Sequence, residues 1–302
     1  MPKATGSQAQ VTYIAEVTPG TTPPTPAMKA VYMTGASPEL AKEGYQSGDI
    51  RSDRQIVDFR HGFAQANMGL DVEMKHGEFD AFLESALFGT FTANVLKAGA
   101  AAQKTFSFEV GYTDIGQYHV LRGMRANSFN LSVTTDAVVT GSFAFVGNAL
   151  TASGTTLDAS PDAPGAKRSF DSFSGTINEG GSPIAIVTAI EMSLENSLEP
   201  AKVIGQSSPD DFFSGRCNVT GTLSAYFEDD SLLTKFRAET PSSIEFTLTD
   251  PDGATMTFLI PRVIYTGGTA PVDGEGGITI ALPFQATYDP TEQTALKITR
   301  SA

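Results

Sequence analysis

Two segments 80 residues apart, Val139–Val146 (VTGSFAFV) and Val219–Phe227 (VTGTLSAYF), both read Val-Thr-Gly-hydroxyl and then run into apolar residues. A third segment, Met68–Met74 (MGLDVEM), has the same alternation of apolar and small or polar residues. A period of two predicts strands with one buried face. The chain also holds 29 Gly and 17 Pro, which favours many turns over long helices. These features predict a mainly β protein.

The order of predicted elements repeats along the 302 residues. A Gly-containing strand is followed by an amphipathic helix, a hairpin, a long strand and a closing strand, first from Met68 and again from Asn218. We take Gly69 and Gly221 as equivalent. The repeat predicts two copies, at residues 1–151 and 169–302, joined by a Gly/Ser/Pro/Ala-rich linker at residues 152–168. Because few residues are identical, a chance parallel between two β-rich halves stays open.

Each predicted helix has a short apolar stripe and a recognisable start. The first stripe falls at helical spacing, and the second follows acidic and hydroxyl residues suited to an N-cap. The stripes are Phe79, Phe82, Leu83, Ala86 and Leu87 in the first copy, and Leu232, Leu233 and Phe236, after Asp229, Asp230 and Ser231, in the second.

The charge balance argues against a surface that grips nucleic acid. The chain has 34 acidic and 20 basic residues, a net charge of −14, whereas phosphate binding needs clustered Lys and Arg. No signal peptide is recognisable, and no apolar run approaches the roughly 20 residues that span a bilayer. We therefore expect no membrane partner and a chain that is cytoplasmic when made. The single cysteine, Cys217, is expected to be a small buried side chain in a strand.

No constellation of residues predicts catalysis. His61, His76 and His119 lack the spacing of metal ligands, and no P-loop or nucleophile motif is present. Asp250–Gly253 (DPDG) has the composition of a hairpin turn and lacks the ligand spacing of a calcium loop. We expect no enzymatic activity, no cofactor and no bound metal.

One face of the predicted strands is small, hydroxylated or acidic, with few Lys or Arg. Such a face would be smooth and would repel polyanions, although an ordinary solvated sheet face remains an alternative. The segment from Gly48 to Gly62 is rich in mixed charge without strand or helix period. A long irregular loop of this kind is either partner-binding or simply flexible. Its charged residues are Asp49, Arg51, Asp53, Arg54, Asp58 and Arg60.

With these elements the chain resembles the phage tail tube proteins of long, flexible, non-contractile tails, in a two-domain form. The resemblance rests on the early loop EGYQSGDIRSDRQIVDFRHG, the strand MGLDVEM, the helix GEFDAFLESAL and the closing strands, and it covers nearly the whole chain. It implies two tandem β-sandwich or half-barrel domains, each flanked by one α-helix. It also implies trimeric, pseudo-six-fold rings stacked into a hollow tube that conducts DNA, with the long loop reaching a neighbouring subunit or ring and no surrounding sheath.

The resemblance also implies where the polar strand face lies in the assembly and which partners the chain has. It implies self-association, contacts with tail terminator, tail tip and tape measure proteins, and passage of DNA without specific binding, in a virion tail assembled in the host cytoplasm. Alternatives are a paired carbohydrate- or receptor-binding β-sandwich and a tube subunit of a bacterial secretion or injection machine. The residues expected to face the lumen are Asp71, Glu73, Ser128, Asn130, Ser132, Glu191, Glu195, Thr222 and Ser224.

Overall fold

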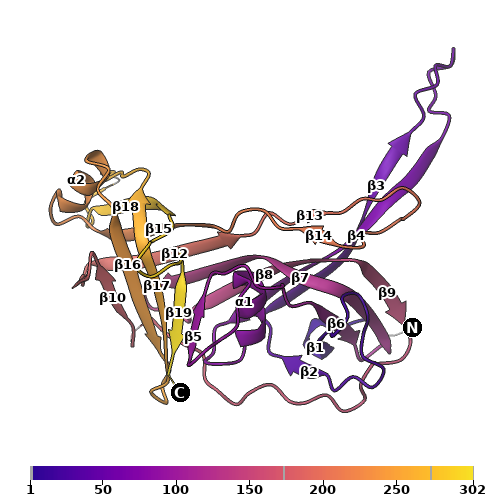
Figure 1. The fold of residues 1–302 in the computed structure, drawn as a ribbon, viewed down its shortest axis with the longest axis horizontal. Helices are drawn as coiled ribbons and strands as arrows, with labels where there is room; N and C mark the ends of the chain where they lie inside the picture. Colours follow the sequence, from indigo (N-terminus) through magenta and orange to yellow (C-terminus); the bar gives the residue numbers. More distant parts are fainter. Residues whose placement is uncertain (1–2, 173, 273, 302) are drawn as a thin grey trace.

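The computed structural model describes residues 3–172, 174–272 and 274–301. Within them, 17 strands are joined by hydrogen bonds into one sheet, and two short strands form a separate pair. Two helices, a 3-10 turn at Gly6–Gln8 and connecting loops complete the fold (Figure 1). The protein is therefore mainly β with two helices, as the alternating sequence predicts.

The first half, residues 9–153, contains two layers that share one long strand, β7 (Gln117–Thr134). The N-terminal part of β7 pairs with β6 and β9, and its C-terminal part pairs with β8. The outer layer comprises β1 (Ala9–Ala15), β2 (Lys29–Val31), β6 (Phe106–Tyr112) and β9 (Ala149–Ser153). The inner layer comprises β3 (Gly35–Gln46), β4 (Phe59–Glu73) and β8 (Thr140–Gly147).

The second half, residues 176–300, repeats this plan around β17 (Thr255–Tyr265). The pairing order β1–β6–β7–β8–β4–β3 recurs as β10–β16–β17–β18–β15–β12. The inner strands are β12 (Val187–Glu195), β15 (Asn218–Tyr226) and β18 (Thr279–Ala286). The outer strands are β10 (Thr176–Glu179), β11 (Ser182–Pro183), β16 (Ser242–Thr249) and β19 (Lys297–Arg300).

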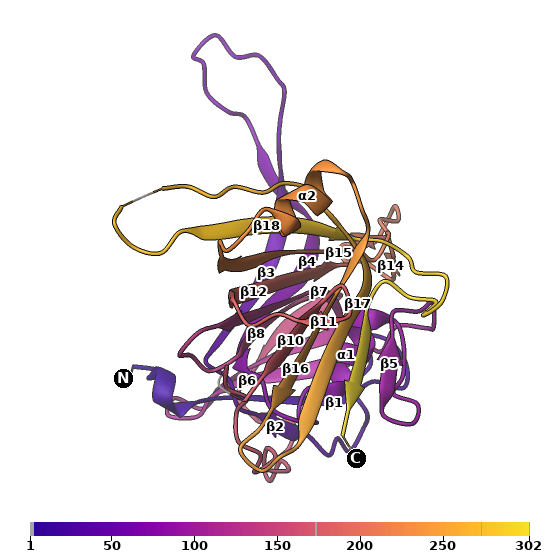
Figure 2. The ribbon, with the colours of Figure 1, turned by 90° about the vertical axis from the view of Figure 1, so that its left-hand side faces the viewer.

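The two halves are joined by strand pairing. β7 and β12 form a seven-residue antiparallel ladder that makes the inner layers continuous, and β5 (Val95–Lys97) pairs with β19 (Figure 2). The described residues between β9 and β10 form isolated bridges but no strand. Domain boundaries at 152–168 stay a prediction, since one sheet runs through both halves.

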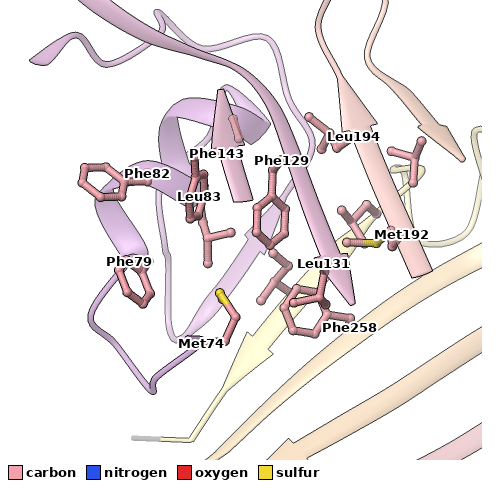
Figure 3. Close-up of a cluster of buried hydrophobic side chains, with 14 of the residues drawn as sticks. Met74, Phe79, Phe82, Leu83, Phe129, Leu131, Phe143, Met192, Leu194 and Phe258 are labelled. Atoms are coloured by element: carbon pink, nitrogen blue, oxygen red, sulfur yellow. The ribbon is translucent and has the colours of Figure 1, made fainter. Parts of the chain in front are cut away.

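Helix α1 (Asp80–Leu87) fills the space between the layers of the first half. Its predicted apolar stripe is fully buried. Figure 3 shows Phe79, Phe82 and Leu83 beside Phe143 and Phe129, with Met192 and Leu194 of β12 farther along the same core. One hydrophobic core thus extends across the β7–β12 ladder. Helix α2 (Ser231–Arg237) buries only Leu232 and Leu233.

The two Val-Thr-Gly strands share a packing constraint. Gly141 and Gly221 lie among core-facing positions, where a Cβ would come 2.6 Å from Met74 Sδ and 2.4 Å from Phe284 Cζ, respectively. Both strands therefore need a glycine at these positions, because the side chains of Met74 and Phe284 pack directly against the backbone there. The Asp250–Gly253 segment is the expected hairpin turn between β16 and β17, and Gly253 has φ +87°.

Three sequence expectations are corrected. Gly69 and Gly221 are not equivalent, because Gly69 lies between buried Met68 and Leu70 and so points away from the core, unlike Gly221. Cys217 is exposed, since β15 begins only at Asn218. The stretch from Gly48 to Gly62 is not one loop, because its last residues belong to β4, which begins at Phe59.

Candidate assembly surfaces

The inner layer has a polar face opposite its core. Ladder partners place one row across six strands: Asp71, Ser142, Asn130, Ser193, Thr220 and Gln285. The next row is Glu73, Thr140, Ser132, Glu191, Thr222 and Pro283. Because alternate residues of each strand point to opposite faces, these side chains share the side away from the buried residues. We call these two rows, with the row from Gly69 through Ala144, Ser128 and Glu195 to Asn218, the polar face.

All nine residues expected to face a lumen lie on this side of the sheet. Eight belong to the three rows, and Ser224 lies opposite Ala189 and Ala281 on the same side. An open hollow of about 740 Å³ lies along this face, lined by, among others, Asp71, Asn130, Glu191, Thr222 and Gln285. Whether it faces a lumen in an assembly stays a prediction.

The polar face contains no Lys or Arg within its three rows, while Asp71, Glu73, Glu191 and Glu195 are acidic. Glu73 is the most enclosed of these four, because its Oε2 accepts a hydrogen bond from Ser169 Oγ at 2.7 Å. An acidic face without cations offers phosphate groups no oppositely charged partner.

Five members of the polar face are not among the residues expected from the sequence to face a lumen. Thr140, Ser142, Ser193, Thr220 and Gln285 belong to the same rows as the predicted residues. Alternation within the strands places Ser193 and Gln285 on the non-core side, but the rows that join these five residues do not follow from it. Their membership depends on ladder register, which a single sequence does not define.

A long arm projects from one end of the inner layer. It is formed by β3, β4 and the residues 47–58 between them (Figure 1). A second arm, residues 196–217 with the short pair β13 (Glu199–Pro200) and β14 (Phe212–Phe213), leans on it. Ala64 N donates to Ser207 O at 2.7 Å, and Lys202 pairs with Glu43.

The six charged residues predicted from the early loop all lie at or near the tip of the first arm. Arg51 forms a bidentate pair with Asp53 at 2.8 and 2.6 Å, which holds the pKa of that carboxyl below its usual value. Arg60, the only one inside a strand, pairs with Asp58 at 2.8 Å. Arg54 has no carboxylate partner within the described part of the chain, and Asp49 lies beside fully exposed Ile50.

Exposed apolar side chains gather along the arms. They include Tyr45, Ile50, Ile56, Val57 and Phe59 on the first arm and Val203, Ile204 and Phe213 on the second. Ile50 and Ile204 are 100% and 103% exposed, and the runs of apolar side chains around them are candidate contacts with another molecule.

The second arm is anchored to the first half by polar contacts, of which those of Asn196 are buried. Arg125 Nη1 lies 2.6 Å from Asp211 Oδ1, and Asn196 Nδ2 donates to the carbonyl oxygens of Ala86 and Ala126 at 2.9 and 3.2 Å. The pKa of Asp211 is lowered: its partial burial opposes the shift, but hydrogen bonds from Phe212 N and Arg125 outweigh it. These contacts hold the base of the arm in one orientation.

The inner layer ends in two unpaired edges. β3 pairs with β4 on one side, and no ladder occupies its other side among the described residues. At the opposite end, residues 266–272, which continue β17, run beside β18: Thr266 N donates to Pro283 O at 2.8 Å, and Thr269 bridges Ala281. The sheet of one chain is therefore open, and no closed barrel forms within the described residues.

No group of three or more His, Cys, Asp or Glu residues that could hold a metal occurs in the described ranges. His76 Nε2 lies 3.2 Å from Ser301 Oγ, and the rings of His61 and His119 stack edge-on with Phe59 and Tyr112. No helix among the described residues has the length and apolar character of a membrane span.

Comparison with known proteins gives one extensive match. A family model described as phage tail tube protein matches residues 6–286. Among solved structures, a chain of the anti-feeding prophage baseplate, six-fold symmetrised, is 12% identical, with a TM-score of 0.28 over 36% of this chain and 85% of that chain. No curated protein matches the sequence.

Proposed function

The chain belongs to the phage tail tube protein family, and from this premise we propose that its inner layer is a segment of the wall of a hollow tail tube through which phage DNA passes into the host cell. Family membership makes the protein a structural component of the virion tail. Ring formation, stacking and DNA delivery by this chain are the proposal.

The β7–β12 ladder carries the proposal. This ladder makes the inner layers of two similar halves continuous, and among the described residues both outer edges of the combined layer lack strand partners. Unpaired edges expose backbone donors and acceptors that invite further strands, and a closed ring removes them. Three chains, each contributing two halves, would give a pseudo-six-fold ring of the kind the resemblance implies.

In such a ring the polar face lines the channel. Its acidic and small hydroxylated side chains, without cations in the three rows, provide no counterion-releasing contact for phosphates. DNA would then move past the wall without specific binding, and the chain would act without catalysis, cofactor or metal.

The arms supply contacts between rings. They project from one end of the layer and carry the exposed apolar residues and the charged tip with Arg54 (Figure 1). A tail terminator, tail tip and tape measure protein would meet the same tube at its ends and channel, in assembly within the host cytoplasm.

Negative-stain electron microscopy of the purified protein at high concentration tests the proposal. Hollow tubes of stacked rings are expected, and end-on class averages distinguish three-fold from six-fold symmetry. Particles that remain single chains at high concentration, even when seeded with tail tips, would contradict it.

Removal of the arm tip separates ring formation from stacking. Replacement of residues 48–57 by a short Gly-containing turn is expected to leave rings but prevent long tubes, because the fully exposed Ile50 is lost with the tip. The matched control is Arg51→Ala with Asp53→Ala, which removes one exposed ion pair but keeps the apolar tip. Tubes of normal length from the shortened variant would assign stacking to another surface.

A further inference from the structure

The strands of the two halves can be aligned through an irregularity that both share. In the β6–β7 ladder, Phe106 pairs with Met124 and Phe108 with Leu121, so β7 carries one extra residue between the two pairs. In the β16–β17 ladder, Ser242 pairs with Val263 and Ile244 with Ile260, so β17 carries one extra residue at the same place. Both equivalent pairs on the long strands, Leu121 with Ile260 and Met124 with Val263, differ by 139 positions. A β-bulge at the same place in both strands is a reliable marker because it re-aims every residue after it.

The same offset of 139 holds for the pairing of the long strands with β8 and β18. Ala126 faces Phe145 in the first half, and Tyr265 faces Phe284 in the second. Farther along, Asn130 faces Ser142, and Thr269 bridges Ala281. Residues 266–272 are therefore the counterpart of the part of β7 that pairs with β12.

The opposite edges correspond in the same way. Met68 faces Phe145 and Pro38, whereas Gly221 faces Phe284 and Met192. β3 is thus the counterpart of β12, with Pro38 equivalent to Met192. In the first half the partner of β7 is β12 of the same chain, but 266–272 and the outer edge of β3 lack their counterparts within the described residues.

We infer that residues 266–272 of one chain pair antiparallel with β3 of a second copy, in the register of the β7–β12 ladder. This inference rests on the proposed function and specifies which strands join neighbouring chains in the tube wall. Within one chain, the ladder pairs Asn130 with Ser193, Leu131 with Met192, and Val133 with Ile190. The corresponding pairs between chains are Thr269 with Glu39, Ala270 with Pro38, and Val272 with Ala36.

Side-chain size supports this register. On the core side of the sheet, this register places a large residue opposite a small one at each end of the intermolecular ladder. Leu40 lies opposite Gly268, and Val272 lies opposite Ala36. Leu40 and Val272 are 36% and 74% exposed in the single chain, and the pairing covers both. At Gly268 a Cβ would lie 2.5 Å from Leu233 Cδ2, so the strand is already packed against α2 from within. On the polar side the register joins Glu39 to Thr269 and creates no like-charge pair.

Disulfide trapping tests the register. In a Cys217→Ala background, the pair Glu39→Cys with Thr269→Cys is compared with Ser37→Cys or Ala41→Cys, each with Thr269→Cys. Directly opposed residues have Cβ atoms about 4.5–5.5 Å apart, whereas residues displaced by two lie roughly 7–8 Å away, beyond the reach of a disulfide. The intrachain pair Asn130→Cys with Ser193→Cys is the geometric control, because it occupies the equivalent rungs.

After mild oxidation of assembled protein, denaturing non-reducing gels should show covalently linked chains at least tenfold more abundant for the Glu39/Thr269 pair than for either displaced pair. Each single variant should stay monomeric. Tubes by microscopy with preferential linkage of a displaced pair, or no linkage although the intrachain control closes, would overturn the register and leave the proposed function intact. Failure of the Cys217→Ala parent to assemble would overturn both.

Discussion

In the first half of the chain the ring of Phe82 lies within 6.3 Å of six other aromatic rings. Among the described residues of the second half, one stacked pair, Phe246–Phe258, supplies the aromatic contact. The remaining core of the second half is mainly aliphatic. Helix α1 is buried along most of its length, and α2 only at two leucines. The same strand order is thus built with different side chains, so alternation and turns determine topology while packing varies.

The largest effect should separate the two helices. Phe82→Ala is expected to lower the free energy of unfolding by about 3–5 kcal/mol, because it empties the centre of a closed aromatic cluster. Leu233→Ala, in peripheral α2, should cost about 2 kcal/mol. Urea unfolding measures both, and equal losses would show that the second core is as tightly packed as the first.

Alkaline pH should lower the free energy of unfolding, because each half contains a buried tyrosine. Burial, aided by Glu78, raises the pKa of Tyr13 to about 12, and burial with Glu179 raises that of Tyr265 further. A raised folded-state pKa means that stability is complete below the unfolded value near 10 and is lost as pH rises through the folded value.

Tyr13→Phe should therefore reduce the loss of unfolding free energy between pH 9 and 12 by about 2 kcal/mol. Exposed Tyr288 supplies the control, since Tyr288→Phe should leave the pH profile unchanged. Urea unfolding at stepped pH makes the comparison. Identical profiles for all three proteins would indicate that Tyr13 ionises without unfolding.

The equivalent hairpin turns differ more subtly. Asp250 Oδ1 accepts from Asp252 N and Ala254 N at 2.9 and 2.8 Å, within its own turn. Asp114 in the first turn accepts from distant Thr5 N at an exposed site. Asp250→Ala should cost about 1 kcal/mol and Asp114→Ala less than about 0.5 kcal/mol. Thermal unfolding should rank them in that order, and the reverse order would locate the sensitive turn in the first half.

Much of this fold could be predicted from the alternation and the turn residues. The stripe Phe79–Leu87, the DPDG hairpin and the shared side of the nine polar residues all depend on local periodicity. The Gly69–Gly221 equivalence was wrong by one residue, which reverses the face, because the repeat of Gly in similar strands carries no information about register.

The arms could not be predicted as they are. Residues 59–62 continue β4 because β3 pairs with them across the arm, a contact between segments with no apolar alternation. The exposure of Cys217 follows from the second arm, which replaces the expected strand before Asn218. Both features depend on tertiary pairing, which a local sequence pattern does not report.

The smallest stability change should come from the polar face. Glu191→Lys replaces an exposed side chain between Ser132 and Thr222 and should alter unfolding by less than about 0.5 kcal/mol. In assembled tubes, however, the added cations should retain DNA in a salt-dependent manner. Glu239→Lys, on an exposed loop after α2, controls for net charge; equal DNA retention by both variants would place Glu191 outside the channel.

The β7–β12 ladder has a kinetic consequence. Since both strands belong to one polypeptide, that joint forms by a unimolecular step, with an effective concentration on the order of millimolar that dilution cannot lower. If each ring holds three chains, only the joints through 266–272 and β3 require diffusional encounter. Half of the strand pairings that close the wall would then form at a rate that depends on protein concentration. The other half are already present once each chain has folded.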